Sequence, residues 1–305
     1  MLTNYPNGVS SFGLPLIGSG PILTTGKVLF VNNAHGNASN GNKGEAPDRP
    51  LSSITAALLK CTANNFDHII CGPGHVETIT AVDALVLDVA GVSLIGIGIG
   101  SNRPRINFTT NTLADMNITA ANVSIRNMLF TGGIDGLGTI IDITGNDLHL
   151  IDIEYRDVTG EATNFLNIAA SRCNIRGFLY RGAAAAGGIA AIQASNCEFL
   201  SIRDFFIDGN FSTGAINFFG VASLNVDIRE GYIRNRNASD ICIVDTVTGS
   251  TGKIGPNLML SLADNAANIT ESITGATWRL FGPIKVVNLD GEQAFDINTT
   301  VSADA

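Results

Sequence analysis

Charged side chains are scarce in this sequence, and basic ones are the scarcer kind. Only 15% of the 305 residues are charged, and 18 Lys and Arg against 27 Asp and Glu give a formal net charge of −9. Proteins that bind nucleic acid generally present a basic face, so this balance argues against nucleic acid as a partner. The chain is nevertheless 45% hydrophobic, which excludes general disorder and predicts one large elongated core.

Long apolar runs are also missing. No stretch of about 18 uninterrupted apolar residues occurs, so we expect no transmembrane helix and no membrane insertion. The N-terminus has no basic region followed by an apolar stretch, so we expect that the protein lacks an ordinary secretory signal and is assembled in the cytoplasm.

Motifs that carry catalysis or bind cofactors are absent as well. The sequence has no GxSxG, phosphate-binding loop, HExxH or CxxC, and no Cys/His spacing typical of zinc sites. We therefore predict no catalytic residue, no metal and no cofactor. His75 and Glu77 follow a Pro-Gly turn, and we interpret them as part of a loop after a strand. The cysteines, which we expect to be reduced and buried, are Cys61, Cys71, Cys173, Cys197 and Cys242.

What the sequence does contain is a short block that returns about every 25 residues. Examples are LIDIEYRD, IRGFLYRG and IRDFFIDG, each of which starts with an apolar residue. Self-similarity at a fixed period indicates stacked structural repeats. The blocks begin at Leu94, Ile125, Leu150, Ile175, Ile202 and Ile228.

A second, mostly polar series keeps the same period. Most of its members sit between apolar neighbours, as in Ile141-Asp142-Ile143, which is the alternation of a strand with one buried face. The members are Asn117, Asp142, Asn167, Gln193, Phe219, Asp245 and Glu271.

Together the two series predict an all-β protein, a right-handed parallel β-helix that is a single-stranded solenoid of about nine coils over residues 66–285. Each period holds two or three strand-like runs separated by Gly, Asn and Asp, and none holds an amphipathic helical pattern. A propeller is the structural alternative, but its blades need about 40 residues or more.

The N-terminal flank does not follow the repeat. Residues 1–25 contain no charged side chain and are rich in Gly, Pro and Ser, so we expect an extended arm that lies on another protein surface. The residues predicted to anchor this arm are Tyr5, Pro6, Phe12, Leu14, Leu16 and Ile17.

Residues 26–65 predict a cap for the first coil. A strand at Lys27–Val31 and a polar loop are followed by Leu51–Cys61, whose apolar residues recur at helical spacing. A short helix here would cover the open end of the core, which a solenoid needs. At the other end, residues 286–305 are predicted to form a second cap or a tail, with a strand at Lys285–Leu289.

Gly182–Ala194 is unusually rich in small residues. Small side chains permit close approach between backbones, so we interpret this stretch as a contact between subunits of a homotrimer. A narrow coil or a flexible loop is the alternative. The predicted contact residues are Ala183, Ala184, Ala185 and Ala186.

Arginines recur at the second position of the block, at Arg126, Arg176, Arg203 and Arg229. Three of them fall on successive coils, about 5 Å apart, so they need carboxylates between them. One interpretation is a salt-bridge ladder. The other is a groove for an anionic glycan, formed by Arg176, Arg203, Arg229, Asp204 and Glu230.

Carboxylates at the same place in successive blocks also permit an enzymatic interpretation. A glycoside can be hydrolysed by two carboxylates about 5 to 9.5 Å apart, and the pairs Asp152 with Asp204 or Asp204 with Glu230 are the candidates. Repeats create such pairs automatically, so the pairs alone do not indicate an enzyme.

Two segments resemble known proteins. KVLFVNNAHGNASNGNKGEAPDRPLSSITAAL resembles the first strand, loop and helix of pectin-lyase-like β-helix proteins. PGHVETIT and DVAGVSLIGIGIGSNRPRINFT resemble β-helix proteins of tailed phages and prophages. The resemblance covers about residues 1 to 160 and implies a trimeric, tailspike-like or capsid-decorating virion component. It transfers no catalytic residue.

The sequence therefore favours a non-enzymatic structural protein of a tailed-phage virion. We expect a homotrimeric capsid decoration protein, a head spike or cement protein, that binds the major capsid protein through its N-terminal arm. Tailspikes normally have a longer tail-binding domain and a larger rod, which favours the head surface over the tail. The alternatives are a short tailspike that binds or depolymerises host polysaccharide, and a passive adhesin for a host surface glycan.

Overall fold

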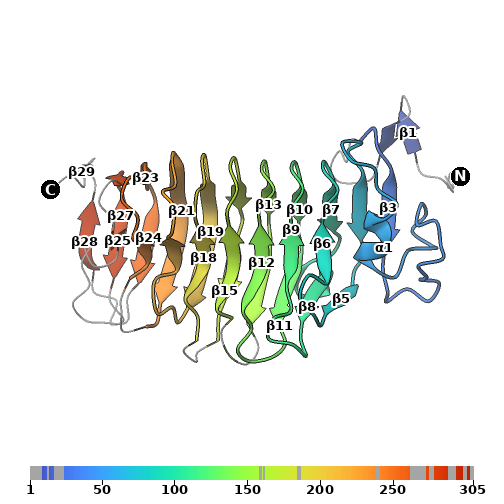
Figure 1. The fold of residues 1–305 in the computed structure, drawn as a ribbon, viewed down its shortest axis with the longest axis horizontal. Helices are drawn as coiled ribbons and strands as arrows, with labels where there is room; N and C mark the ends of the chain where they lie inside the picture. The colour runs from blue at the N-terminus through green and yellow to red at the C-terminus, as the bar shows by residue number, and fades with distance from the viewer. Residues whose placement is uncertain are drawn as a thin grey trace, which may run out of the picture.

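The chain winds into a rod of stacked β coils, with the first coils at one end and the last coils at the other (Figure 1). This computed structural model is all-β, with parallel sheets that form a β-solenoid of about eight turns and almost no helix. The residues that it describes are 9–11, 14–16, 24–157, 160, 162–183, 187–237, 241–261, 273–274, 278–287, 293–297 and 301–302.

Each turn consists of a first, a second and a third strand. The first strands are β4 (His68–Cys71), β7 (Ser93–Gly96), β10 (Ser124–Arg126), β13 (His149–Ile151), β16 (Asn174–Arg176), the starts of β19 (Ser201–Gly209) and β21 (Val226–Asn235), and β23 (Gly252–Ile254). The second strands are β5 (Val76–Ile79), β8 (Arg105–Phe108), β11 (Leu129–Gly132), β14 (Glu154–Asp157), β17 (Leu179–Arg181), the ends of β19 and β21, and β24 (Leu258–Ser261). The third strands are β6 (Leu85–Leu87), β9 (Met116–Ile118), β12 (Thr139–Ile143), β15 (Asn164–Ile168), β18 (Ala190–Ala194), β20 (Ile216–Phe218), β22 (Ile243–Asp245) and β25 (Ile273–Thr274).

Partial turns flank these eight. Strand β3 (Val28–Val31) pairs with β4 before the first turn, which confirms the strand predicted at Lys27–Val31. After the last turn, β26 (Trp278–Leu280) and β27 (Ile284–Val287) continue the first and second strands. They pair antiparallel with β29 (Val301–Ser302) and β28 (Gln293–Ile297). Nine coils were predicted because the first series of the sequence has nine members. The last of these members lies in β26, which belongs to a partial turn.

The first series of the sequence is confirmed in register along the whole rod. Each member pairs directly with its counterpart in the next coil, and all are buried. These residues stack as one apolar column through the core: Ile69, Leu94, Ile125, Leu150, Ile175, Ile202, Ile228, Ile254 and Leu280.

The second series is correct as far as Gln193 and wrong beyond it. Gln193 pairs with Asn217 and not with Phe219, because the coil that joins β18 to β20 is two residues shorter than the assumed period. Val244 and Thr274 continue this outward series, so Asp245 instead pairs with Phe218. Glu271 lies outside the described residues.

Two of the three corners of each coil are bends that contain at least one residue in the left-handed region. Such residues are most often Gly, Asn or Asp, because a Cβ atom is strained there. Between third and first strands they include Gly91, Asn122, Asp147, Arg172, Phe199 and Asn225, and between first and second strands Asn127, Asp152, Gly177, Asp204 and Glu230. Asn64 takes the equivalent place before β4. Most of them donate their backbone N–H to the carbonyl oxygen that precedes the equivalent residue of the next coil.

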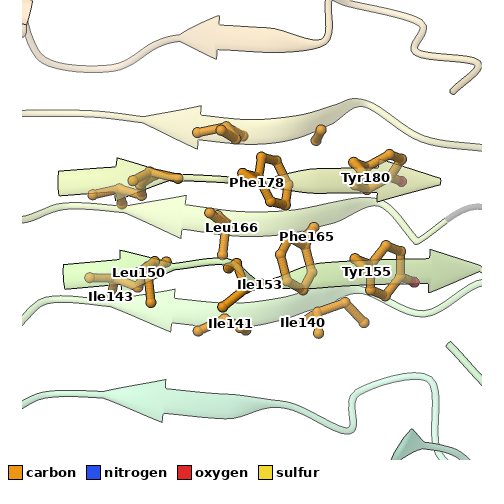
Figure 2. Close-up of a cluster of buried hydrophobic side chains, with 14 of the residues drawn as sticks. Ile140, Ile141, Ile143, Leu150, Ile153, Tyr155, Phe165, Leu166, Phe178 and Tyr180 are labelled. Atoms are coloured by element: carbon orange, nitrogen blue, oxygen red, sulfur yellow. The ribbon is translucent and has the colours of Figure 1, made fainter. Parts of the chain in front are cut away.

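The interior is filled by an aromatic cluster in the central coils. The rings of Tyr155 and Tyr180 lie one above the other, with centroids 5.1 Å apart, and Phe165 stacks on Phe178 at 5.6 Å (Figure 2). Asn164 pairs with Ala190, so Ala191 is the counterpart of Phe165 in the next coil, and both alanines are fully buried. The small residues of β18 therefore leave room for the large side chains of the neighbouring coil. For this part of Gly182–Ala194, the packing agrees with the narrow coil that was the alternative to a subunit contact.

Helix α1 (Ile54–Leu58) packs beside the first coil, against β3, β4 and β6. Its range is shorter than the predicted Leu51–Cys61 because Ser53 caps it, accepting a hydrogen bond from the Ala56 N–H. The buried side is formed by Ile54, Ala57 and Leu58. Ahead of the rod, β1 (Val9–Ser11) pairs antiparallel with β2 (Leu14–Leu16) in a two-stranded sheet.

We predict that Gly231→Ala destabilises the rod by about 2 kcal/mol, because overpacking a filled core has costs of this order. A Cβ atom at Gly231 would lie 2.3 Å from the ring of Phe205, its partner in the preceding coil. Thermal unfolding measures the effect. Phe205→Leu should recover part of the loss in the double variant, and Gly138→Ala, where the nearest atom is 3.4 Å away, serves as the control. Equal effects at Gly138 and Gly231 would contradict this packing.

We also predict that Asp245→Asn stabilises the protein at pH 7. Burial raises the pKa of Asp245, although N–H and hydroxyl donors from Val247 and Ser250 oppose the shift, and its Oδ2 has no hydrogen-bond partner in the described structure. A raised carboxyl pKa makes the native state more stable below the ordinary value of 3.8 and less stable as pH rises through the folded pKa. The variant should therefore gain about 1 kcal/mol at pH 7. Thermal melts of wild type and variant as a function of pH measure this difference. A variant that stays more stable than wild type below pH 3.8 would contradict the prediction.

Candidate functional site

The richest surface of the rod is the outward side of the second strands, which we name the Arg-aromatic face. Two columns of side chains run along it from β8 to β27, in register from coil to coil. The first column is Arg105, Leu129, Glu154, Leu179, Phe206, Tyr232, Met259 and Lys285, and the second is Asn107, Thr131, Arg156, Arg181, Asp208, Arg234, Ser261 and Val287. Five cations and two carboxylates make this face positive on a chain with a net charge of −9.

A loop covers one end of the Arg-aromatic face. Residues 96–103 leave β7, form a single 3-10 turn at Gly100–Asn102, and are held by Asn127, whose Nδ2 donates to the carbonyl oxygens of Gly96 and Gly98. The outward Leu129 is buried, whereas Ile99 beside the 3-10 turn is 85% exposed. The face is therefore bounded near β11 and more open from β17 onward.

Glu154 forms ion pairs with three arginines next to this loop. It is only 4% exposed, and it forms an ion pair with Arg103 on one oxygen. Its other oxygen accepts from Arg156 Nε at 2.6 Å and lies 3.4 Å from Arg181 Nε. Arg156 also donates to Ser101 Oγ at 2.9 Å, so the cluster joins the loop to two successive second strands.

One carboxylate does not neutralise this cluster. Burial raises the pKa of Glu154, but the hydrogen bond and charge of Arg156, together with Arg103 and Arg181, outweigh it, and the net effect lowers the pKa. Glu154 is thus an anion at neutral pH. The Arg105 Nε nearby is buried without a hydrogen-bond partner among the described residues.

Beyond the cluster, the first column becomes apolar and aromatic. Leu179, Phe206, Tyr232 and Met259 occupy four successive coils. The rings of Phe206 and Tyr232 are stacked, with centroids 5.0 Å apart and planes at 18°. Phe206 is 40% exposed and Met259 39%. Phe206 and Met259 are therefore exposed apolar side chains, whereas Tyr232 between them is half-buried.

Charged residues border these rings on the side of the loops that join the second strands to the third strands. Asp208 is held by Arg236 through two hydrogen bonds of 2.8 and 2.5 Å. Arg234 has no salt-bridge partner in the described part of the chain. The border therefore offers the guanidinium groups of Arg181 and Arg234 to solvent or to a ligand.

The residues predicted to form a glycan groove lie on the opposite border of the same rings. Arg176, Arg203 and Arg229 pair directly on successive coils, as predicted. Asp204 and Glu230 are exposed and occupy the left-handed bend that leads into the second strand. Arg176 Nε donates to Asp204 at 2.9 Å and Arg229 Nε lies 3.5 Å from Asp227, so part of the set forms the ion pairs of the salt-bridge interpretation.

The candidate catalytic pairs share this bend. Asp152, Asp204 and Glu230 all have positive φ, and a Cβ atom at Gly177 would lie 2.2 Å from Asp152 Oδ1. Their residue types are thus explained by the bend itself, except for Glu230, which is unfavourable in this conformation. Asp204 and Glu230 are exposed, whereas the general acid of a glycosidase commonly sits in a desolvated pocket.

Most residues predicted to bind partners lie outside the described residues. Of the predicted arm anchors, only the backbones of Leu14 and Leu16 are described, both in β2. Of the predicted trimer contacts, Ala183 is half-buried after β17, and Ala184, Ala185 and Ala186 are not among the described positions.

His75 and Glu77 form a structural link. The fully buried His75 accepts from the Asn33 N–H through Nδ1 and shares its Nε2 proton with Glu77 at 3.1 Å. Glu77 also accepts from the N–H of Ile54 at 3.0 Å, which ties β5 to the start of α1. His75 lies in the loop between β4 and β5, as predicted. Glu77 lies within β5, so the prediction of a loop is wrong for this residue.

The described thiols are poor nucleophiles. All five cysteines are free, and four of them are buried. Burial raises the pKa of Cys61 and of Cys173 to about 12, and it also raises the pKa of Cys71 and Cys197. No group of three or more His, Cys, Asp and Glu in the described ranges is arranged to hold a metal ion. Among the described helices, none is long and apolar enough to span a membrane.

Sequence reasoning missed the aromatic column and the Glu154 cluster. The signal was present in the second half of each block, where EYR, LYR, FFID and YIR place outward residues at alternate positions. The sequence analysis assigned an outward side chain only to the second position of the block. Loop 96–103 occurs in one coil, so no periodic pattern could indicate that it covers this face.

We predict that Glu154→Gln destabilises the protein by about 3 kcal/mol at pH 7, because three arginines would lose their buried counterion. A carboxyl with a lowered pKa supplies its stability above the ordinary value of 4.5 and loses it as pH falls through the folded pKa. Wild type and variant should therefore converge in thermal melts only below pH 4.5. Arg176→Gln, which breaks an exposed pair, is the matched control and should change stability by less than about 1 kcal/mol. A variant as stable as wild type at pH 7 would show that Glu154 is dispensable.

Comparison with known proteins gives no relative from which a role could be transferred. No protein-family model matches this chain, and no curated protein or solved structure is significantly similar to it.

Proposed function

We propose that this protein is a non-enzymatic structural protein of a tailed-phage virion. In this proposal it is a homotrimeric decoration protein of the head, which binds the major capsid protein through its N-terminal arm. Its right-handed rod then stands on the particle surface, closed at its base by α1.

The observation that carries the proposal is the separation of arm and rod. Strands β1 and β2 pair with each other in their own two-stranded sheet, and within the described residues they share no pairing with the solenoid. Figure 1 shows β1 displaced from the stacked coils. A separate apolar segment beside a closed rod suits attachment to another protein better than support of its own core.

The buried ionisable groups support the non-enzymatic part of the proposal. Asp67 is fully buried and accepts hydrogen bonds from the N–H groups of Lys27 and Thr62, which hold the first strand and the loop after α1. His75 and Glu154 have comparable structural partners. Ionisable groups that are buried in this way have a structural role, since each one forms hydrogen bonds with backbone or side-chain groups of neighbouring segments.

Deletion of residues 1–20 tests the proposal. The truncated protein should still be a folded trimer in light scattering coupled to size-exclusion chromatography, because the described solenoid begins after this segment. It should no longer co-sediment with phage heads that lack the protein, whereas the full chain should. A truncated chain that still binds heads, or a monomeric full chain, contradicts the proposal. Release of reducing ends or unsaturated products from host polysaccharide would favour the depolymerase alternative.

A further inference from the structure

We propose that the first two turns of the rod are seated in an apolar opening between capsid subunits, which they contact through an apolar collar. This inference rests on the proposed virion role and deepens it, because it identifies a second contact surface besides the N-terminal arm. The apolar collar is the set of exposed large apolar residues that precede β9: Leu59, Phe66, Val82, Ile97, Ile99 and Leu113.

The distribution of exposed apolar side chains along the rod supplies the first argument. In the described part of the chain, six of the eleven large apolar residues that are exposed lie between residues 59 and 113. None of the described residues from 114 to 198 belongs to this class. Figure 1 shows that the first two turns lie at the end of the rod where α1 and β1 are found. Single exposed apolar side chains are ordinary, but their accumulation at one end indicates a contact there.

The apolar collar reaches all three corners of the coils. Ile97 and Ile99 lie between a first and a second strand, Val82 and Leu113 lie between second and third strands, and Phe66 directly precedes the first strand β4. A contact between copies of the chain uses one side of each rod, and the remaining corners then face outward around the base. A partner that fits apolar residues on every corner is one that encloses the base, as an opening in a lattice of capsid subunits does.

Hydrogen bonds hold the loops of the apolar collar in place. The Leu113 N–H donates to Asn111 Oδ1 at 2.9 Å. The Asp83 N–H, in the loop of the first turn, donates to Asp115 Oδ1 in the loop of the second turn, so the two loops are joined. On another corner, the Ile97 N–H donates to the carbonyl oxygen of the last residue of β4 at 2.9 Å. Loops that are fixed in this way lose little conformational entropy on binding, which suits a preformed docking surface.

Phe66 connects the apolar collar to the N-terminal arm. Its φ of 59° lies in the left-handed region, which is unfavourable for a bulky residue, and its side chain is 57% exposed. Strain of this kind is found mostly at functional positions. The Thr24 hydroxyl donates to the Phe66 carbonyl oxygen, so the chain enters the rod beside the apolar collar, directly after the uncharged residues 1–23. The arm and the apolar collar are therefore placed to contact one partner.

Acidic side chains beside the apolar collar indicate the charge of the partner. Asp83 follows Val82 and is exposed, and Asp115 lies two residues after Leu113. Neither carboxylate has an ion pair within the described ranges. Burial raises the pKa of Asp115, as do neighbouring carboxylates, although the Asp83 N–H opposes the shift. We therefore expect Lys or Arg on the rim of the opening, whereas these carboxylates disfavour an anionic lipid surface.

A double variant tests the proposal in co-sedimentation with phage heads that lack the protein. Ile99→Ser with Leu113→Ser should weaken head binding at least about tenfold although the arm is intact, because two buried apolar contacts are lost. These side chains are 85% and 64% exposed in the free protein, so the fold should persist. The matched control is Phe199→Ser with Val221→Ser, which removes two apolar side chains that are 54% and 56% exposed far from the base and should leave binding unchanged.

Circular dichroism, thermal melts and light scattering verify the fold and the trimer of each variant. Undiminished binding of the double variant, while truncation of the arm abolishes binding, would overturn this inference and leave the virion role intact. An equal loss in the control would overturn it as well. A monomeric double variant would place the apolar collar between copies and also overturn it. A full chain that does not bind heads contradicts both proposals.

Thiol labelling tests the contact directly. The variants Ile99→Cys and Phe199→Cys should both react with a maleimide in the free protein, after subtraction of the wild-type background from Cys61. On heads only Phe199→Cys should stay reactive, and equal labelling of Ile99→Cys in both states would overturn the proposal. Co-sedimentation of the full chain with phosphatidylcholine vesicles, if the double variant loses it, would identify lipid as the occupant and overturn it too.

Discussion

In-register stacking of each coil on the next is the constraint on which the rest of the structure depends. It is fixed by left-handed residues at two corners, which donate their N–H groups to the following coil and thereby hold every strand at one position. With register fixed, a side chain meets its own counterpart 25 or so residues later, so apolar columns fill the core and outward columns accumulate like residues. Packing between coils then becomes a matter of size, as with Phe205 over Gly231 and Phe165 beside Ala191.

The same constraint explains how a surface can differ so much from one side of the rod to another. Outward third strands carry mainly amides, and Asn167 donates to the carboxylate of Asp142 at 2.7 Å. Outward second strands carry arginines, two carboxylates and stacked rings beside corner loops of varying length. Function on a solenoid is commonly placed where loops vary, because insertions there do not disturb the stacked strands. The Arg-aromatic face meets that condition.

The sequence predicted the solenoid because Ile and Leu recur at one position, and burial admits little else there. It failed where a coil changed length: the shorter coil before Asn217 moved Asp245 inward and removed Phe219 from the outward column. The arginines of the first strand were predictable from their spacing, and the pairing of Arg176 with Asp204 followed from charge. Glu154 was not, because its importance arises from Arg103 on a distant loop. Phe206 and Tyr232 could have been identified from alternation within each block.

We propose that this rod is a structural component of a phage particle and that its second-strand face is exposed to solvent there. Cryo-electron microscopy of particles that contain the chain tests it most directly. We expect threefold rod density on the head surface, with density for residues 1–25 embedded between capsid subunits and the column of Phe206 and Tyr232 facing solvent. Density confined to the tail, or a second-strand face buried between rods, would contradict it.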